Sequence, residues 1–146
     1  MGYRSDVAFV ASFDSEEKAD KFWGCVMLEI SEDQELLTEV TSTFQRFKYP
    51  KSDCVHFIYS VTDIKWYGGR GIVELMEEYM MGRYVSSQVT KCGGGYNFVR
   101  IGEEENDIEA NSDYSSECAD YCVGEMYDIF QLRRYIEMNA AGVDTY

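Results

Sequence analysis

The chain has 146 residues, of which 45% are hydrophobic and 15% aromatic, and a formal net charge of −14. This length corresponds to about one domain, and the composition excludes a wholly disordered chain. The acidic charge argues against direct binding of nucleic acid or of an anionic membrane, because both repel carboxylates. No apolar run approaches the roughly 20 residues of a membrane-spanning helix. We therefore predict one domain that covers residues 1–146.

The chain carries an odd number of cysteines, and its start does not resemble a secretory signal. An odd count without a signal argues against a disulfide framework. We expect reduced thiols and a cytoplasmic location. The cysteines are Cys25, Cys54, Cys92, Cys118 and Cys122.

The first third of the chain predicts a strand followed by two helices. Alternation in residues 5–13 predicts a strand, and Asp14 with Glu17 has the spacing of a helix cap. Apolar residues at helical spacing then continue as far as Ile30, and residues 31–40 predict a second, short helix. The strand residues expected on one face are Val7, Phe9, Ala11 and Phe13.

The middle of the chain predicts two extended segments and a helix. Residues 42–50 are expected to be extended and to end at Pro50, and residues 54–67 form the clearest strand pattern. A strand of that length exceeds the usual range, so a bend is expected near Thr62–Asp63. Residues 72–81 predict a helix, whose expected inner face is Ile72, Leu75, Met76, Tyr79 and Met80.

The last third predicts a short strand, an acidic loop and a C-terminal extension. Residues 96–101 are expected to form the strand, residues 103–113 the loop, and residues 115–126 a possible helix. Residues 127–138 favour a strand because they are rich in β-branched and aromatic side chains. The order of elements predicts an α+β fold: an antiparallel sheet of ferredoxin-like split βαβ order, with helices on one face and a C-terminal extension.

The acidic stretch and the cysteines do not fit the common metal sites. Calcium loops that start at Glu105 or Asp107 lack the glycine and the final glutamate that an EF-hand requires. Cys118 and Cys122 have helical spacing, but His56 is the only histidine and structural zinc needs four ligands. We therefore predict no metal and no cofactor.

Catalytic and phosphate-binding patterns are weak as well. Along one strand, Cys54 and His56 lie too far apart for the hydrogen bond of a catalytic pair. The glycines at 68–71 precede a helix but have no Walker lysine, and acidic residues follow them closely. The expectation is a protein that is not an enzyme.

The strongest feature is a run of acidic residues without a base between Ile101 and Leu132. Such a one-sign surface attracts basic grooves, including grooves built for nucleic acid. The alternative is that the charge serves only solubility. The predicted acidic face consists of Glu103, Glu104, Glu105, Asp107, Glu109, Asp113, Glu117 and Asp120. The predicted aromatic anchors are Tyr114, Tyr121 and Tyr127.

Three segments resemble one group of known proteins: MGYRSDVAF at the start, DIKWY after the long strand, and YNFVRIGEEENDIE further on. They are similar to small acidic proteins of uncharacterised function encoded by phages and prophages, over residues 1–110. The resemblance implies no functional residues. By analogy, a phage setting suggests an inhibitor directed at a host defence complex. An alternative interpretation of the last motif is structural: Ile101 and Ile108 would anchor the acidic turn in the core.

Together these features predict a non-enzymatic interaction protein. Its acidic face would bind a basic surface of a host protein, with nucleic-acid mimicry in an anti-defence role as one form of that binding. The alternative is a binder of a nucleotide-like signal, with Arg70 and Arg100 as anion contacts. The oligomeric state is left open by the sequence.

Overall fold

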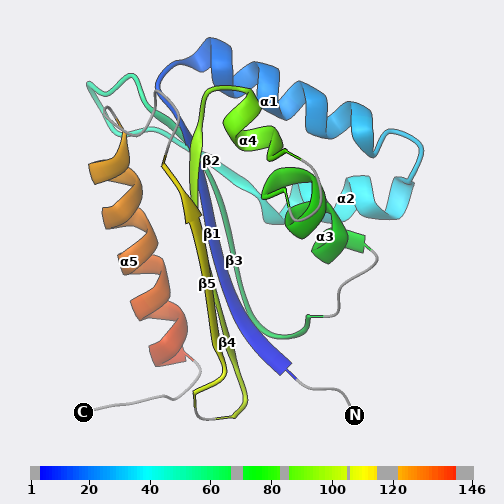
Figure 1. Cartoon of the computed structure of the whole chain (residues 1–146), viewed down its shortest axis with the longest axis vertical. Helices are drawn as coiled ribbons and strands as arrows, with labels where there is room; N and C mark the ends of the chain where they lie inside the picture. The colour runs from blue at the N-terminus through cyan, green and yellow to red at the C-terminus, as the bar shows by residue number, and fades with distance from the viewer. Residues whose placement is uncertain (1–3, 67–70, 83–85, 105, 115–121, 141–146) are drawn as a thin grey trace.

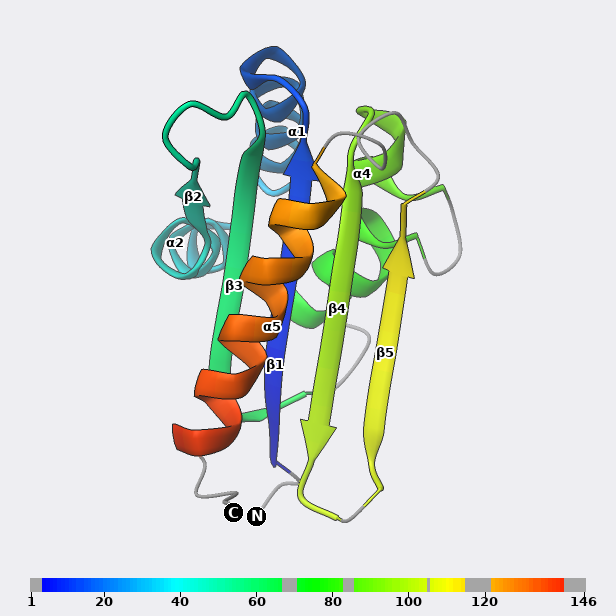
Figure 2. The same cartoon turned by 90° about the vertical axis from the view of Figure 1, so that its left-hand side faces the viewer.

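A five-stranded antiparallel sheet forms the centre of the computed structural model, which describes residues 4–66, 71–82, 86–104, 106–114 and 122–140. The strands lie in the order β2-β3-β1-β4-β5 (Figure 2). Their bounds are β1 Arg4–Phe13, β2 Gln45–Phe47, β3 Val55–Lys65, β4 Gly95–Gly102 and β5 Ile108–Asp113.

Helices cover both faces of this sheet (Figure 1). One face carries α1 Glu16–Glu29, α2 Gln34–Thr43, α3 Gly71–Glu74, the π-helix η1 Leu75–Met80 and α4 Gln88–Lys91. The other face carries α5 Val123–Ala140. The predicted α+β class with an antiparallel sheet is confirmed. The helices before β4 lie together on one face, as predicted, and α5, in the part predicted as a C-terminal extension, covers the other face.

The first four strands interleave, with β3 between β1 and β2 and β1 between β3 and β4. The ferredoxin-like pattern expected from the sequence does not describe the whole chain, because β5 adds an edge strand and α5 adds a layer. None of the helices in the described ranges is long and apolar enough to cross a membrane.

The central strand β1 is buried on both sides. Its odd-numbered apolar residues face α1 to α4, as predicted, and join the larger core cluster. Ala8 and Val10 point the other way and pack with Met126, Ile129 and Phe130 of α5. A strand that is covered by helices on both faces loses the alternation of apolar and polar residues, which is why Ala8 and Val10 are apolar.

The helix α5 replaces the strand that was predicted for residues 127–138. Met126, Ile129 and Phe130 have helical spacing, and all three are buried against the sheet. This spacing is visible in the sequence, but the β-branched and aromatic content outweighed it in the prediction. Packing of one apolar face against a sheet overrides such local propensity.

The acidic stretch also contains a strand that was expected to be a loop. β5 pairs with β4 from Ile101↔Ile108 to Tyr96↔Asp113. The turn between them includes Asn106 at φ 74°, a conformation that asparagine tolerates better than most residues. Ile101 packs beneath α5, but Ile108 is 55% exposed, so it does not anchor the turn in the core.

Helix caps and one bulge refine the predicted boundaries. Ser15 rather than Asp14 caps α1, and Asp33 caps α2, each accepting a hydrogen bond from a backbone N–H three residues later. The predicted bend in β3 is confirmed: Asp63 has φ 55°, and the pairing of β1 with β3 shifts there. The bulge lets Asp6 accept a hydrogen bond from the Asp63 N–H at 2.9 Å.

The cysteines differ from the reduced state that was expected. Cys54 and Cys122, each one residue before an element, form a disulfide between the start of β3 and the start of α5. Cys25 and Cys92 are free thiols. Cys118 lies outside the described residues.

Candidate binding cleft

The predicted acidic face divides into parts with different surroundings. Glu103 and Glu104 are exposed in the turn between β4 and β5. Asp107 and Glu109 lie beside Arg100, and Asp113 is half-buried at the far end of β5. Glu105, Glu117 and Asp120 lie outside the described residues.

Arg100 binds two of the predicted carboxylates. Its Nη2 donates to Asp107 Oδ1 at 2.9 Å, and its Nε donates to Glu109 Oε1 at 3.0 Å. Its Nη1 donates to Ser5 Oγ at 3.0 Å. Hydrogen bonding to Asp107 is the main reason that the pKa of Arg100 is raised. One guanidinium is therefore shared by Asp107 and Glu109 and offsets one of their two charges.

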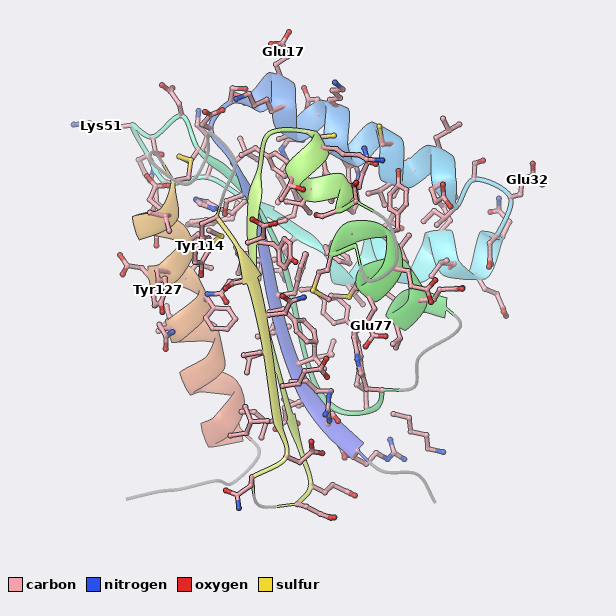
Figure 3. The ribbon with its side chains drawn as sticks, viewed as in Figure 1. Glu17, Glu32, Lys51, Glu77, Tyr114 and Tyr127 are labelled. Carbon is pink, nitrogen blue, oxygen red and sulfur yellow. A yellow bond between two sulfur atoms is a disulfide. The ribbon has the colours of Figure 1, made fainter. Side chains whose placement is uncertain are left out.

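Two of the predicted aromatic anchors, Tyr114 and Tyr127, lie on the side of the molecule that carries α5. Tyr114 and Tyr127 lie next to each other there (Figure 3). Tyr114 is half-buried and packs on the cluster beneath α5, and burial raises its pKa. Tyr127 is 47% exposed. Tyr121 lies outside the described residues, so the structure brings together two of the three anchors.

A cleft of about 390 Å³ lies on the face of the sheet opposite α5, between the α1–α2 turn and α3–η1. Its inner wall is apolar and includes Ile30, Leu36 and Leu75, together with the ring of Tyr79. Its rim carries four carboxylates, which belong to Glu29, Asp33, Glu74 and Glu78. Glu32 projects to solvent from the adjoining turn (Figure 3). We call this feature the acid-rimmed cleft.

The four rim carboxylates form no ion pair with a Lys or Arg in the described part of the chain. Three basic side chains elsewhere pair with other acidic residues: Lys18 with Asp14, Arg46 with Asp20, and Lys48 with Glu16. The four rim carboxylates therefore lack the direct cation contact that Asp107 and Glu109 have in the hairpin. Because an apolar wall excludes water, their negative potential acts on a ligand with less screening there.

The π-helix η1 shapes one wall of the cleft. The Met81 N–H bonds to the Met76 carbonyl oxygen at 2.9 Å, five residues back. This wider turn buries residues five apart on the same side, Leu75 with Met80 and Met76 with Met81. Single π-helical turns occur frequently at functional sites.

Tyr79 joins η1 to α1 across the base of the cleft. Its hydroxyl donates to the Cys25 carbonyl oxygen at 3.2 Å. Burial, followed by the nearby Cys25 and Glu29, raises the pKa of Tyr79 to about 12. The hydroxyl therefore remains protonated at neutral pH and fixes the wall against α1.

The sequence contained a signal for this cleft. Residues 22–45 include five acidic residues and no Lys or Arg. The acidic run after Ile101 is longer, and the acidic face was predicted there. The fold alone places Glu74 and Glu78, about forty residues later in the chain, beside the α1–α2 turn.

The buried histidine was also considered as a catalytic residue. Ser12 Oγ lies 2.6 Å from His56 Nδ1, and His56 Nε2 lies 2.9 Å from Glu125 Oε1. Burial lowers the pKa of His56, although Glu125 opposes this effect. Ser12 and His56 are both 0% exposed, so a substrate has no direct access to either. We interpret this cluster as an attachment point for α5.

No group of three or more His, Cys, Asp or Glu side chains in the described ranges is arranged to hold a metal ion. The rim carboxylates of the cleft form no such group either, which suits the separate cationic side chains of a ligand better than one metal ion. Comparisons with protein-family models, with curated proteins and with solved structures find no match to this chain.

Proposed function

We propose that this chain is a non-enzymatic interaction protein that receives a basic segment of a partner protein in the acid-rimmed cleft. The observation that carries the proposal is an apolar wall surrounded by Glu29, Asp33, Glu74 and Glu78, which have no basic partner among the described residues. A lysine or arginine side chain fits this chemistry, because its aliphatic stem packs on apolar surface while its charged end remains among carboxylates.

The proposal keeps the predicted type of partner and moves the binding site. Arg100 already pairs with Asp107 and Glu109, so those two carboxylates offer less attraction to a second cation. Exposed Glu103 and Glu104 contribute steering from the hairpin and not a binding pocket. Two separated acidic regions on one molecule suit a partner whose basic groove is built for nucleic acid.

A host protein is the partner that we propose, in keeping with the resemblance to phage-encoded proteins. The role would be inhibition of a defence complex, with the acidic surface competing for the groove that holds nucleic acid. We place this binding in the cytoplasm, where such complexes act.

The alternative of a nucleotide-like ligand has less support. Arg100 donates hydrogen bonds to Asp107, Glu109 and Ser5, so its guanidinium already has anionic partners. Arg70, the other expected anion contact, lies outside the described residues. A thermal-shift series with nucleotides separates the two functions, because only the alternative expects the melting temperature to rise.

The test uses a defined basic peptide with interspersed leucines, and its affinity is measured by fluorescence anisotropy across a salt series. The cleft variant carries Glu29→Gln, Asp33→Asn, Glu74→Gln and Glu78→Gln, and Asn at position 33 preserves a helix-capping residue. We expect this variant to bind about tenfold more weakly, which corresponds to about 1.4 kcal/mol.

The matched control removes four charges from the acidic run instead, through Glu103→Gln, Glu104→Gln, Asp113→Asn and Asp128→Asn. Its net charge equals that of the cleft variant, so a non-specific charge effect weakens both equally. We expect the control to keep at least half of the affinity. Equal weakening of both variants, or no binding by the natural protein at low salt, would overturn the proposal.

A further inference from the structure

The first turn of α5 is attached to the sheet by a disulfide that is buried. Cys54 and Cys122 are both 0% exposed, with Cα atoms 5.8 Å apart. They are separated by 68 residues in the chain. The bond therefore connects the start of β3 directly to the start of α5, two elements that are far apart in the sequence.

A chain of polar side chains beside this disulfide makes a second attachment. Glu125 on α5 accepts a hydrogen bond from His56 Nε2 at 2.9 Å and one from the Ser52 hydroxyl at 2.6 Å. With that proton on Nε2, His56 Nδ1 accepts from the Ser12 hydroxyl at 2.6 Å. Ser52 Oγ in turn accepts from the Cys54 N–H at 3.1 Å. We call these four residues, Ser12, His56, Glu125 and Ser52, the polar chain.

The same site also accommodates the reduced state. Cys122 Sγ lies 3.4 Å from the Phe13 carbonyl oxygen, so the reduced thiol has an acceptor for its proton. The polar chain involves neither sulfur atom, so opening the disulfide removes none of its hydrogen-bonding groups. Met126, Ile129 and Phe130 keep the helix on the sheet through apolar contacts. Both redox states are therefore compatible with the folded sheet.

We propose that Cys54 and Cys122 form a redox latch that sets how firmly α5 is attached to the sheet. In the open state the two thiols are reduced, and the polar chain and the apolar contacts alone hold the first turn. Closure removes two protons and two electrons from the thiols and forms one S–S bond. The oxidant is a small-molecule or protein disulfide, which accepts the electrons and becomes two thiols.

The latch reconciles a cytoplasmic location with a disulfide. Disulfides in that compartment are rare and are usually transient or redox-sensing. Because both sulfur atoms are buried, an attacking thiolate reaches them only when the first turn of α5 moves away. Reduction and opening of α5 are consequently linked steps. This inference does not depend on the acid-rimmed cleft, which lies at the other end of the fold.

The test measures hydrogen exchange by mass spectrometry in a full-length variant that keeps only this cysteine pair, through Cys25→Ser, Cys92→Ala and Cys118→Ser. The oxidised sample is prepared with glutathione disulfide and the reduced sample with excess dithiothreitol. We expect amides of residues 123–132 to exchange at least about tenfold faster after reduction. Amides of β1 and β4 should be unchanged.

The control variant carries Cys54→Ser and Cys122→Ser and keeps the other three cysteines. Its exchange in residues 123–132 should match that of the reduced sample and should not respond to the reductant. Equal exchange of α5 in both redox states would overturn the latch. Exchange that rises in every strand on reduction would overturn it too, because the disulfide would then be required for the whole fold.

Discussion

The hairpin β4–β5 and the acid-rimmed cleft both present carboxylates, but their electrostatic surroundings are different. In the hairpin, Arg100 donates to Asp107 and Glu109. Around the cleft, Glu29, Asp33, Glu74 and Glu78 have no basic partner in the described part of the chain. The number of acidic residues in a segment thus does not measure its attraction for a cation. What matters is which carboxylates the fold leaves without a counterion.

Glu125 is a carboxylate of a third kind, because its partner His56 is fully buried. Replacement His56→Gln leaves Ser12 and Glu125 with lost hydrogen bonds, and we expect the free energy of unfolding at pH 8 to fall by about 3 kcal/mol. Urea denaturation measures this loss. A change below about 0.5 kcal/mol would show that the polar chain contributes little to stability.

The pH dependence of the free energy of unfolding tests the contribution of His56, because it is the only histidine in the chain. Its pKa is lowered in the folded state by burial, so the unfolded chain binds a proton more readily. The histidine therefore contributes full stability above pH 6.5, and this contribution is lost as the pH falls from 6.5 through the lower folded pKa. The difference in unfolding free energy between the natural protein and His56→Gln should shrink as the pH falls through this range.

Removal of Arg100 should make the hairpin electrostatically similar to the cleft. In Arg100→Met, Asp107 and Glu109 lose their cation, and we expect the free energy of unfolding to fall by about 2 kcal/mol. Lys48→Met is the control, because Lys48 makes only an exposed contact of 3.6 Å with Glu16. It should cost less than about 0.5 kcal/mol. Equal losses in the two variants would remove the distinction between the regions.

The smallest predicted changes in the free energy of unfolding are an increase at the cleft and a decrease at the hairpin. Glu78→Gln should raise the free energy of unfolding by about 0.3 kcal/mol, because it relieves repulsion from Glu74. Glu109→Gln should lower it by about 0.5 kcal/mol, because it weakens the contact with Arg100. Both changes should become smaller at 1 M NaCl, where charges are screened within about 3 Å. Matching signs for the two variants at low salt would contradict the comparison.

Local patterns predicted much of the fold. Alternation identified β1 and β3, a short strand was predicted where β4 lies, and helical spacing identified α1 and the inner face of α3–η1. The errors share one cause. β5 and α5 were misassigned because each is defined by what it packs against, β4 in one case and the second face of the sheet in the other. Burial of β1 on both faces was the sign that a helix covers Ala8 and Val10.

The sequence predicted less of the candidate site than of the fold. Two glutamates of the predicted acidic face, Glu103 and Glu104, are exposed, as expected. The pairing of Arg100 with Asp107 and Glu109 follows from the register of a hairpin that was not predicted. The disulfide between Cys54 and Cys122 joins residues 68 positions apart, and the odd cysteine count argued against it.

By itself, the sequence determined the sign of the surface charge, the order of most elements and the apolar face of β1, because composition and periodicity are local properties. Only the tertiary structure decided which carboxylates share a cleft and which meet a guanidinium. It also decided which thiols meet and what lies over the second face of the sheet. Coulomb attraction, hydrogen bonding and disulfide formation all depend on distance in space, and the fold alone brings Glu29 close to Glu78 or Cys54 to Cys122.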